Sequence, residues 1–371
     1  MNKVFKVVYS KSKGCYVVVP ETAKNNNGKK KVLASVLAGF AVAGAMGGIA
    51  PLEVQAGIDT NNSHVNIWAE TSPKGNGQNY NVGQNSIVVG YQNTTDNVAG
   101  HDGKVAIGAR NTSTNNSSTA MGNRNNATGG ASTAIGAGND AVADATVALG
   151  NKNNANATSA TAIGNYNNQN YTKGSWQTTP KQAGNYSTAV GSYNAALGDY
   201  SVSVGTMNTS HVADTVTIGQ NNNAKTMGGI SIGKNNLTDS TNNGTNFGAT
   251  RNENSQIAIG RDNVATHLDT IAIGRETKAT GSGATVVGAR AEASGNNSIA
   301  IGQSGEGSPK VMATGVNSIA IGMQSQATGE SAIAEGPGSR AGGKYGVALG
   351  RTSKANAEAT TALGNAAEAN I

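Results

Sequence analysis

The chain has 371 residues, of which 4% are aromatic and 13% are charged, and its formal net charge is +6. Residues 1–56 hold 8 of the 27 Lys and Arg residues and 2 of the 21 Asp and Glu residues, so the remainder carries 19 charges of each sign. A neutral remainder removes the electrostatic argument for binding nucleic acid or anionic lipid, and no basic stripe is visible in the sequence. The sole cysteine is Cys15, so we expect no disulfide and no thiol chemistry beyond residue 56.

The N-terminal segment has the pattern of an export signal. Three consecutive lysines, residues 29–31, precede an apolar run over residues 32–50, and residues 54–56 (Val-Gln-Ala) supply small side chains where a signal peptidase reads the chain. We predict that residues 1–56 are a cleaved extended signal peptide, with the cut between Ala56 and Gly57. A transmembrane helix over residues 32–50 is the alternative by length, but the many Gly and Ala residues make that run weakly apolar.

A fixed glycine step organises the rest of the chain. Thirteen of the seventeen intervals between successive glycines of this series are 14 residues, and so short a period predicts a solenoid of small identical units. We expect residues 57–85 to be a lead-in and residues 86–371 to form one repeat domain. The series is Gly90, Gly108, Gly122, Gly136, Gly150, Gly164, Gly191, Gly205, Gly219, Gly233, Gly260, Gly274, Gly288, Gly302, Gly322, Gly336, Gly350 and Gly364.

The three positions before each glycine predict a strand. The residue three before it is β-branched in all eighteen copies, the residue two before it is Ala in thirteen, and the residue directly before it is apolar in all but one, Glu335. Side chains two apart share a strand face, so we expect the first and last of these columns to form a buried stripe. The alanine column would then face outward and let a second chain approach closely. The alternative is that alanine is merely tolerated on a solvated face.

A second, weaker strand follows each glycine, as in residues 126–129 (Asn-Ala-Thr-Gly) and 278–281 (Lys-Ala-Thr-Gly). Two short strands and two tight turns account for 14 residues. We therefore predict an all-β fold, a parallel β-roll built from two-strand coils. Coils this thin bury little area per residue, which favours a homo-oligomer joined through the alanine column.

Candidate ligand contacts lie where the repeat is interrupted. The 27-residue step from Gly164 to Gly191 concentrates aromatic residues in a chain that has few of them, namely Tyr166, Tyr171, Trp176 and Tyr186. Aromatic side chains on an exposed loop are suitable contacts for a sugar or a protein. The alternative is that two degenerate coils use these rings to cap the roll internally.

We expect no catalytic residues, no cofactor and no metal ion. The four histidines are scattered, without a Cys or Ser at catalytic spacing. The step from Gly90 to Gly108 contains Asp96, His101 and Asp102, but this spacing matches no metal-binding signature, so we interpret it as a solvated loop.

Two independent segments resemble the YadA-type trimeric autotransporter adhesins of Gram-negative bacteria. Residues 1–24, MNKVFKVVYSKSKGCYVVVPETAK, resemble the extended signal peptide region of that secretion class. Residues 85–90 (NSIVVG), 297–302 (NSIAIG) and 317–322 (NSIAIG) resemble the head-repeat motif. The resemblance implies a left-handed homotrimeric β-roll at the cell surface. It also implies multivalent attachment of the bacterium to host matrix, to cell-surface protein or glycan, or to neighbouring bacteria.

Two features of this family bear on binding and anchoring. Collagen binding is associated with the head motif extended by a serine three residues after its glycine, and only residues 317–325 satisfy all of it. Asn317, Ser318 and Ser325 are therefore candidate ligand residues. Members usually continue into a coiled-coil stalk and a C-terminal β-barrel anchor. These 371 residues show neither pattern, so we expect a fragment or truncated product whose membrane link would be an anchor absent from this chain.

Two other classes of solenoid stay open. A polysaccharide lyase or hydrolase needs paired carboxylates, or a carboxylate with Arg and Lys, facing a cleft, whereas the acidic residues here are spread singly over turns. An ice-binding solenoid needs outward rows of threonine. Such a row recurs here, but in a column that we expect to face inward: Thr119, Thr133, Thr161 and Thr188.

Overall fold

The computed structural model describes residues 5–10, 15–20, 53–59, 64–70, 85–170 except 97 and 99, 179–239 and 255–371. Every regular element in these residues is a β-strand. The chain divides into two compact units, Met1–Glu53 and Val54–Ile371. In the first unit, β1 (Phe5–Ser10) pairs antiparallel with β2 (Cys15–Pro20). β3 spans Glu53–Asp59.

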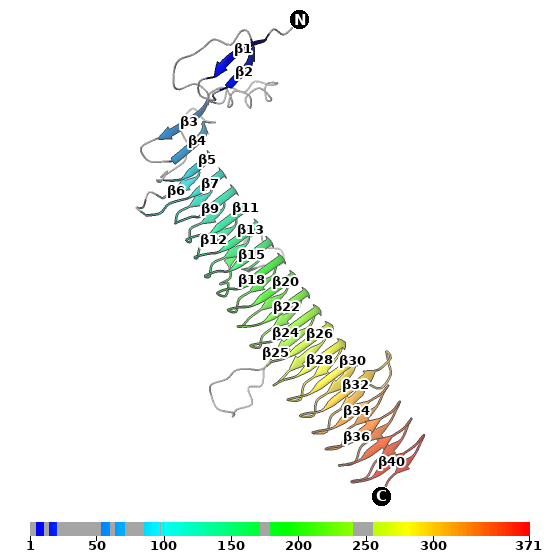
Figure 1. Cartoon of the computed structure of the whole chain (residues 1–371). Coiled ribbons are helices and arrows are strands. Elements are labelled where there is room, and N and C mark those ends of the chain that lie inside the picture. The colour runs from blue at the N-terminus through cyan, green and yellow to red at the C-terminus, as the bar shows by residue number, and fades with distance from the viewer. Residues whose placement is uncertain are drawn as a thin grey trace. The chain divides into compact units, whose positions relative to one another are not determined.

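The second unit is a parallel β-roll in which long and short strands alternate along the chain (Figure 1). The long strands are β4 (His64–Glu70), β5 (Ile87–Tyr91), β7 (Val105–Ala109), β9 (Thr119–Asn123), β11 (Thr133–Ala137), β13 (Val147–Asn151), β15 (Thr161–Asn165), β18 (Thr188–Ser192), β20 (Val202–Thr206), β22 (Val216–Gln220), β24 (Ile230–Lys234), β26 (Ile257–Arg261), β28 (Ile271–Arg275), β30 (Thr285–Ala289), β32 (Ile299–Gln303), β34 (Ile319–Ile321), β36 (Ile333–Glu335), β38 (Val347–Leu349) and β40 (Thr361–Leu363).

The short strands lie between them and form their own parallel sheets. They are β6 (Thr94–Thr95), β8 (Thr112–Ser113), β10 (Asn126–Ala127), β12 (Asp140–Ala141), β14 (Asn154–Ala155), β19 (Ala195–Ala196), β21 (Thr209–Ser210), β23 (Asn223–Ala224), β25 (Leu237–Asp239), β27 (Val264–Thr266), β29 (Lys278–Ala279), β31 (Ala291–Ala293), β33 (Val311–Ala313), β35 (Gln326–Ala327), β37 (Arg340–Ala341), β39 (Lys354–Ala355) and β41 (Glu368–Ala369). A separate antiparallel pair, β16 (Gln169–Asn170) with β17 (Thr179–Pro180), lies in the first 27-residue step.

The repeat sets the strand register. Each long strand pairs in parallel with the equivalent residues of the next coil, so that Gly136 lies opposite Gly150. The register continues across both 27-residue steps, with Thr161 opposite Thr188 and Ile230 opposite Ile257. Insertions therefore leave the ladder intact. The predicted two-strand coil is confirmed, and β4, which lies in the predicted lead-in, continues the long-strand ladder by pairing with β5.

The predicted sidedness of the strand is wrong. The alanines two before each glycine, such as Ala134 and Ala148, are fully buried, and so are the alanines of the short strands, such as Ala127 and Ala141. All residues of the two flanking columns are at least partly exposed. The reason is steric: a coil of only 14 residues brings its two sheets so close that mostly alanine fits between them, and the largest fully buried aliphatic side chains of the described residues are Val88, Val286 and Val311. The larger β-branched and aliphatic side chains are forced outward.

A ladder of buried asparagines fills the corner after each glycine. Asn139 Nδ2 donates to Asn125 Oδ1 at 3.0 Å, to the carbonyl of Ile135 at 3.0 Å and to the carbonyl of Gly150 at 2.7 Å. Its Oδ1 accepts from the backbone N–H of Asn153 at 3.0 Å. Each side chain therefore satisfies turn groups of its own coil and of both neighbours. The ladder comprises Asn93, Asn111, Asn125, Asn139, Asn153, Asn167, Asn194, Asn208, Asn222, Asn236 and Asn263.

The turn that contains the asparagine ladder also requires glycine at each repeat position. Gly150 has φ of 115°, and a Cβ placed on it would lie 2.0 Å from the carbonyl oxygen of Gly164. Both the backbone conformation and the approach of the next coil therefore exclude a side chain.

Substituting Gly150→Ala should destabilise the roll by at least about 4 kcal/mol, because the new methyl group must push two coils apart. Gly138→Ala is the matched control: φ there is 65° and the nearest atom to a new Cβ is Lys152 Cγ at 3.5 Å, so a cost of about 1 kcal/mol is expected. Urea unfolding followed by circular dichroism measures both. Equal losses in the two variants would contradict the steric argument.

Replacing Asn139→Ala should cost about 3 kcal/mol, because it removes the donor to two partly buried carbonyls and the acceptor of a buried amide N–H. Asn151→Ala removes an exposed amide that has only a 3.5 Å contact to the carbonyl of Ala137, so it should change the free energy of unfolding by less than about 0.5 kcal/mol. Chemical denaturation of the two variants side by side tests the contribution of the ladder. If Asn139→Ala left the free energy of unfolding unchanged, the side chain would be dispensable and the prediction wrong.

Candidate functional site

The broadest candidate interaction surface is the outward side of the long strands. We call it the outer apolar face and define it as the residues three and one before each repeat glycine. Its aliphatic members are substantially exposed: Ile135 is 38%, Ile218 39% and Ile301 38% accessible. Because successive coils are about 4.8 Å apart, the residues directly before the glycines form an apolar row along the roll, interrupted at Glu335. The residues three before the glycines form a parallel row in which isoleucine and valine are mixed with threonine. A monomeric soluble protein rarely exposes so long an apolar surface.

Two sequence expectations change on this face. The threonine row, Thr119, Thr133, Thr161 and Thr188, faces outward and not inward, and it is interspersed with Ile and Val in the same column. Glu335 is exposed, and its strand β36 keeps register with both neighbours, so the charge causes no bulge. A carboxylate is tolerated there because the position lies outside the core.

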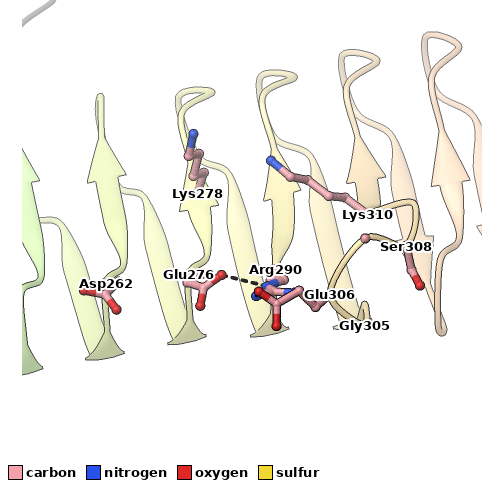
Figure 2. Close-up of a pocket in the computed structure, with 9 residues that line it drawn as sticks. Asp262, Glu276, Lys278, Arg290, Gly305, Glu306, Ser308 and Lys310 are labelled. Atoms are coloured by element: carbon pink, nitrogen blue, oxygen red, sulfur yellow. Dashed lines mark hydrogen bonds and ion pairs between the residues drawn. The ribbon is translucent and has the colours of Figure 1, made fainter.

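A charged recess lies beside the loop after β32. It has a volume of about 490 Å³ and is lined by Asp262, Glu276, Lys278, Arg290, Gly305, Glu306, Gly307, Ser308 and Lys310. Figure 2 shows Glu276, Arg290 and Glu306 grouped beneath that loop. Arg290 Nε is 2.7 Å from Glu276 Oε2, and its Nη2 is 3.4 Å from Glu306 Oε1.

The chemistry of this recess is that of a self-neutralised ion-pair network. The hydrogen bond from Arg290 lowers the pKa of Glu276 and raises that of Arg290 itself. Lys310 is paired in turn with Glu292 at 3.1 Å. A glycosidase acid needs a raised pKa, whereas the Arg290 hydrogen bond shifts the pKa of Glu276 in the opposite direction.

The aromatic residues predicted as contacts do not form one cluster. Tyr166 lies two residues after its glycine and stacks on Tyr193, with ring centroids 5.2 Å apart. Tyr186 lies at the other end of the long strands and stacks on Tyr200 at 5.1 Å. Tyr171 and Trp176 lie outside the described residues. The sequence reasoning missed Tyr193 and Tyr200, although both occupy the same repeat positions one coil later.

The candidate motif residues are mostly internal. Ser318 and Ser325 are fully buried, and Ser325 Oγ donates to the carbonyl of Gly322 at 3.1 Å. Ser325 occupies the corner position that asparagine holds in the earlier coils, so its serine serves the turn. Asn317 is exposed at a turn with φ of 57° and accepts from Asn297 Nδ2 at 3.3 Å. Ligand binding through this motif stays a prediction that rests on Asn317.

The loop between β6 and β7 contains an ion-pair cluster instead of free solvated groups. The Lys104 side chain is fully buried, and its Nζ lies 3.1 Å from Asp96 Oδ1 and contacts the carbonyl of His101. His101 Nδ1 also contacts Asp96 Oδ2 at 2.5 Å. Burial raises the pKa of Asp96, but the hydrogen bonds from His101 and Lys104 outweigh it and bring the pKa below its usual value. The only sequence signal for this cluster is a lysine at a position that is serine or threonine in most other coils.

Other candidate sites are few in the part of the chain that the structure describes. Those residues contain no group of three or more His, Cys, Asp or Glu side chains arranged to hold a metal ion. They also contain no helix long and apolar enough to cross a membrane. The predicted cleavage point between Ala56 and Gly57 falls within β3 and stays a prediction.

Comparison with protein families identifies both parts of the chain. Residues 1–48 match the extended signal peptide of the type V secretion system. The YadA head domain repeat matches residues 105–125, 113–139, 141–167, 183–206, 257–277, 279–304, 313–339 and 341–367. A search of curated proteins found no significant match.

The two families describe one kind of molecule, since a type V signal precedes the head repeats of a surface adhesin, and their matches together span more than half of the chain. Export by type V secretion to the outer surface of the bacterium follows from both matches. The chain therefore belongs to the YadA-type trimeric autotransporter adhesins.

Proposed function

We propose that residues 57–371 are the mature head of an adhesin, released from the signal segment after Ala56, which assembles as a homotrimer and attaches the bacterium to host matrix or to other cells. The observation that carries this proposal is the outer apolar face, a surface that a single chain leaves exposed along the whole roll. The chain has no catalytic role in this proposal. Two carboxylates of the charged recess, Glu276 and Glu306, are both paired with Arg290, which supports that view.

The trimer uses the outer apolar face and not the alanine column. Alanines such as Ala134 lie inside the coil and cannot reach a neighbour, whereas Ile135 beside it is exposed. Three rolls arranged around a common axis would each turn this face inward and cover two rows of aliphatic side chains per chain. Such burial follows the rule that long exposed apolar surfaces are protein contacts. Coils so poor in internal apolar area gain much of their stability this way.

Attachment then depends on the surfaces that remain outside. A solenoid presents the same turn positions again and again, and a trimer multiplies them by three. Many weak contacts in a fixed row reach high avidity without any deep pocket. Host matrix proteins, cell-surface glycans and neighbouring bacteria all present repeated epitopes that suit this mode.

Placing charge on the outer apolar face should dissolve the trimer. We expect the purified chain to sediment as a trimer, and the variant Ile218→Glu with Ile301→Glu to sediment as a monomer, because six carboxylates cannot be buried together without partners. The control is Asn223→Glu, in the short strand β23, which lies outside the outer apolar face. This variant should remain trimeric. Analytical ultracentrifugation measures the oligomeric state of each variant. A monomeric unmodified chain would contradict the proposed trimer.

Removing whole coils should weaken attachment in proportion to the avidity lost. Deleting residues 202–229 removes two 14-residue coils and joins equivalent positions, so the roll is expected to keep its register. Microspheres coated with the shortened protein should bind matrix-coated and cell-coated surfaces less strongly than those coated with the full protein. A coating that binds neither surface above the level of bare microspheres would contradict the adhesin proposal.

A further inference from the structure

A row of cations lies along one edge of the roll. The residue two after each repeat glycine sits at the turn that ends the long strand, with φ near 55° in Arg110, Arg124 and Lys152. These three residues occupy the first, second and fourth of four successive coils, so the row extends for about 14 Å along the roll axis. We call it the basic edge. The neutral charge count of the sequence hides it, because the row exists only once the coils are stacked.

The charges of the basic edge are not neutralised within the part of the chain that the structure describes. None of the three cations makes an ion pair there. The nearby carboxylate on the short strand, Asp140, is hydrogen-bonded by Asn126, and burial raises its pKa. In later coils the charges at the same repeat position are paired, with Arg290 Nε 2.7 Å from Glu276 Oε2. The contrast marks the basic edge as a surface left open for an external anion.

Neighbouring side chains hold two of these cations, Arg110 and Lys152, in place. The Arg110 guanidinium lies 5.8 Å from the centre of the Tyr91 ring, and its Nε donates to Gln92 Oε1 at 3.1 Å. Lys152 Nζ lies 5.1 Å from the centre of the Tyr166 ring. Cations that are positioned before binding lose less conformational entropy when a ligand arrives.

Apart from Asp140, two further carboxylates of these coils lie at the other end of the long strands. Asp102 and Asp144 each precede a repeat glycine by six residues, at the turn that leads into the long strand. Eight residues of mostly extended chain separate this turn from the basic edge, a span of about 20 Å. This exceeds the Debye length at physiological salt, about 8 Å, so the acidic turn does not cancel the field at the basic edge.

We propose that the basic edge binds a linear anionic polysaccharide, which lies along the roll axis with its sulfate or carboxylate groups on Arg110, Arg124 and Lys152. This inference rests on the proposed adhesin function and names the chemical class of one target. A row of single cations at coil spacing fits a thin, extended polymer with regularly placed charges. Binding of single-stranded nucleic acid relies on exposed ring faces for base stacking. Here Lys152 covers one face of Tyr166 and Tyr193 the other, so that platform is missing.

The test measures the affinity of the trimeric chain for immobilised heparin, hyaluronan, dextran and a short DNA duplex over a series of salt concentrations. The test variant combines Arg110→Asn, Arg124→Asn and Lys152→Asn. Asparagine occupies the same repeat position at Asn221 and Asn235 with φ of 54°, so the variant is compatible with the fold. The matched control combines Lys278→Asn, Arg340→Asn and Lys354→Asn, which removes the same charge from short strands where Asn126 and Asn223 already occur.

We expect salt-sensitive binding to heparin or hyaluronan, none to dextran, and at least about a tenfold loss of affinity with a shallower salt dependence in the test variant. The control variant should bind within about twofold of the unmodified chain. Preference for DNA, an equal loss in the control, or no binding to either anionic polysaccharide would overturn the proposal. The microsphere attachment assay is independent of this result, so attachment that persists in the test variant would leave the adhesin function standing and reject only this target.

Discussion

The narrow interior of the 14-residue coil is the constraint on which the rest of the structure depends. A long strand of three to five residues, a short strand of two or three and two tight turns leave room for small side chains, mostly alanine and, among the described residues, no aliphatic residue larger than valine. Ala134 and Ala127 face each other across that space, and both are fully buried. The corner has no space even for a methyl group, which is why the glycine column is maintained and why Asn139 replaces backbone partners with its side-chain amide.

The same constraint explains why the large aliphatic residues are outside. In most globular folds, isoleucine is buried because the core can accommodate it, whereas here isoleucines such as Ile135 are exposed in the single chain. In the proposed trimer, the outer apolar face would become a core shared by three rolls, in keeping with hydrophobic burial. Assembly and folding would then depend on each other.

The repeat pattern of the sequence predicts some features of this fold and leaves others undetermined. The period and the strand-turn pattern around Gly136 specified a parallel two-strand roll without ambiguity. Sidedness was not specified, because alternation of Thr133, Ala134 and Ile135 is equally regular whichever face is inside, and the usual rule that large apolar residues are buried pointed the wrong way. Which face is buried depends on the distance between the two sheets of a coil, and this distance is set only when the coil closes. The burial of the motif serine Ser325 was not predictable for a related reason, since only the closed coil places its corner position inside, and its role in ligand binding stays a prediction.

In a solenoid, the spatial distribution of charge is the property that the linear sequence reveals least. Arg110 and Arg124 are separated by thirteen residues that include no other arginine or lysine, so no local window of the sequence is basic. Stacking converts that separation into about 4.8 Å, and it moves Asp102 and Asp144 to the opposite turn. In the proposed trimer the outer apolar face is tied to assembly, because each of its positions would have to match a neighbouring chain. The turns carry no such requirement, so their side chains are free to differ from coil to coil. Recognition can therefore vary along the edges of the roll while the shared core stays constant.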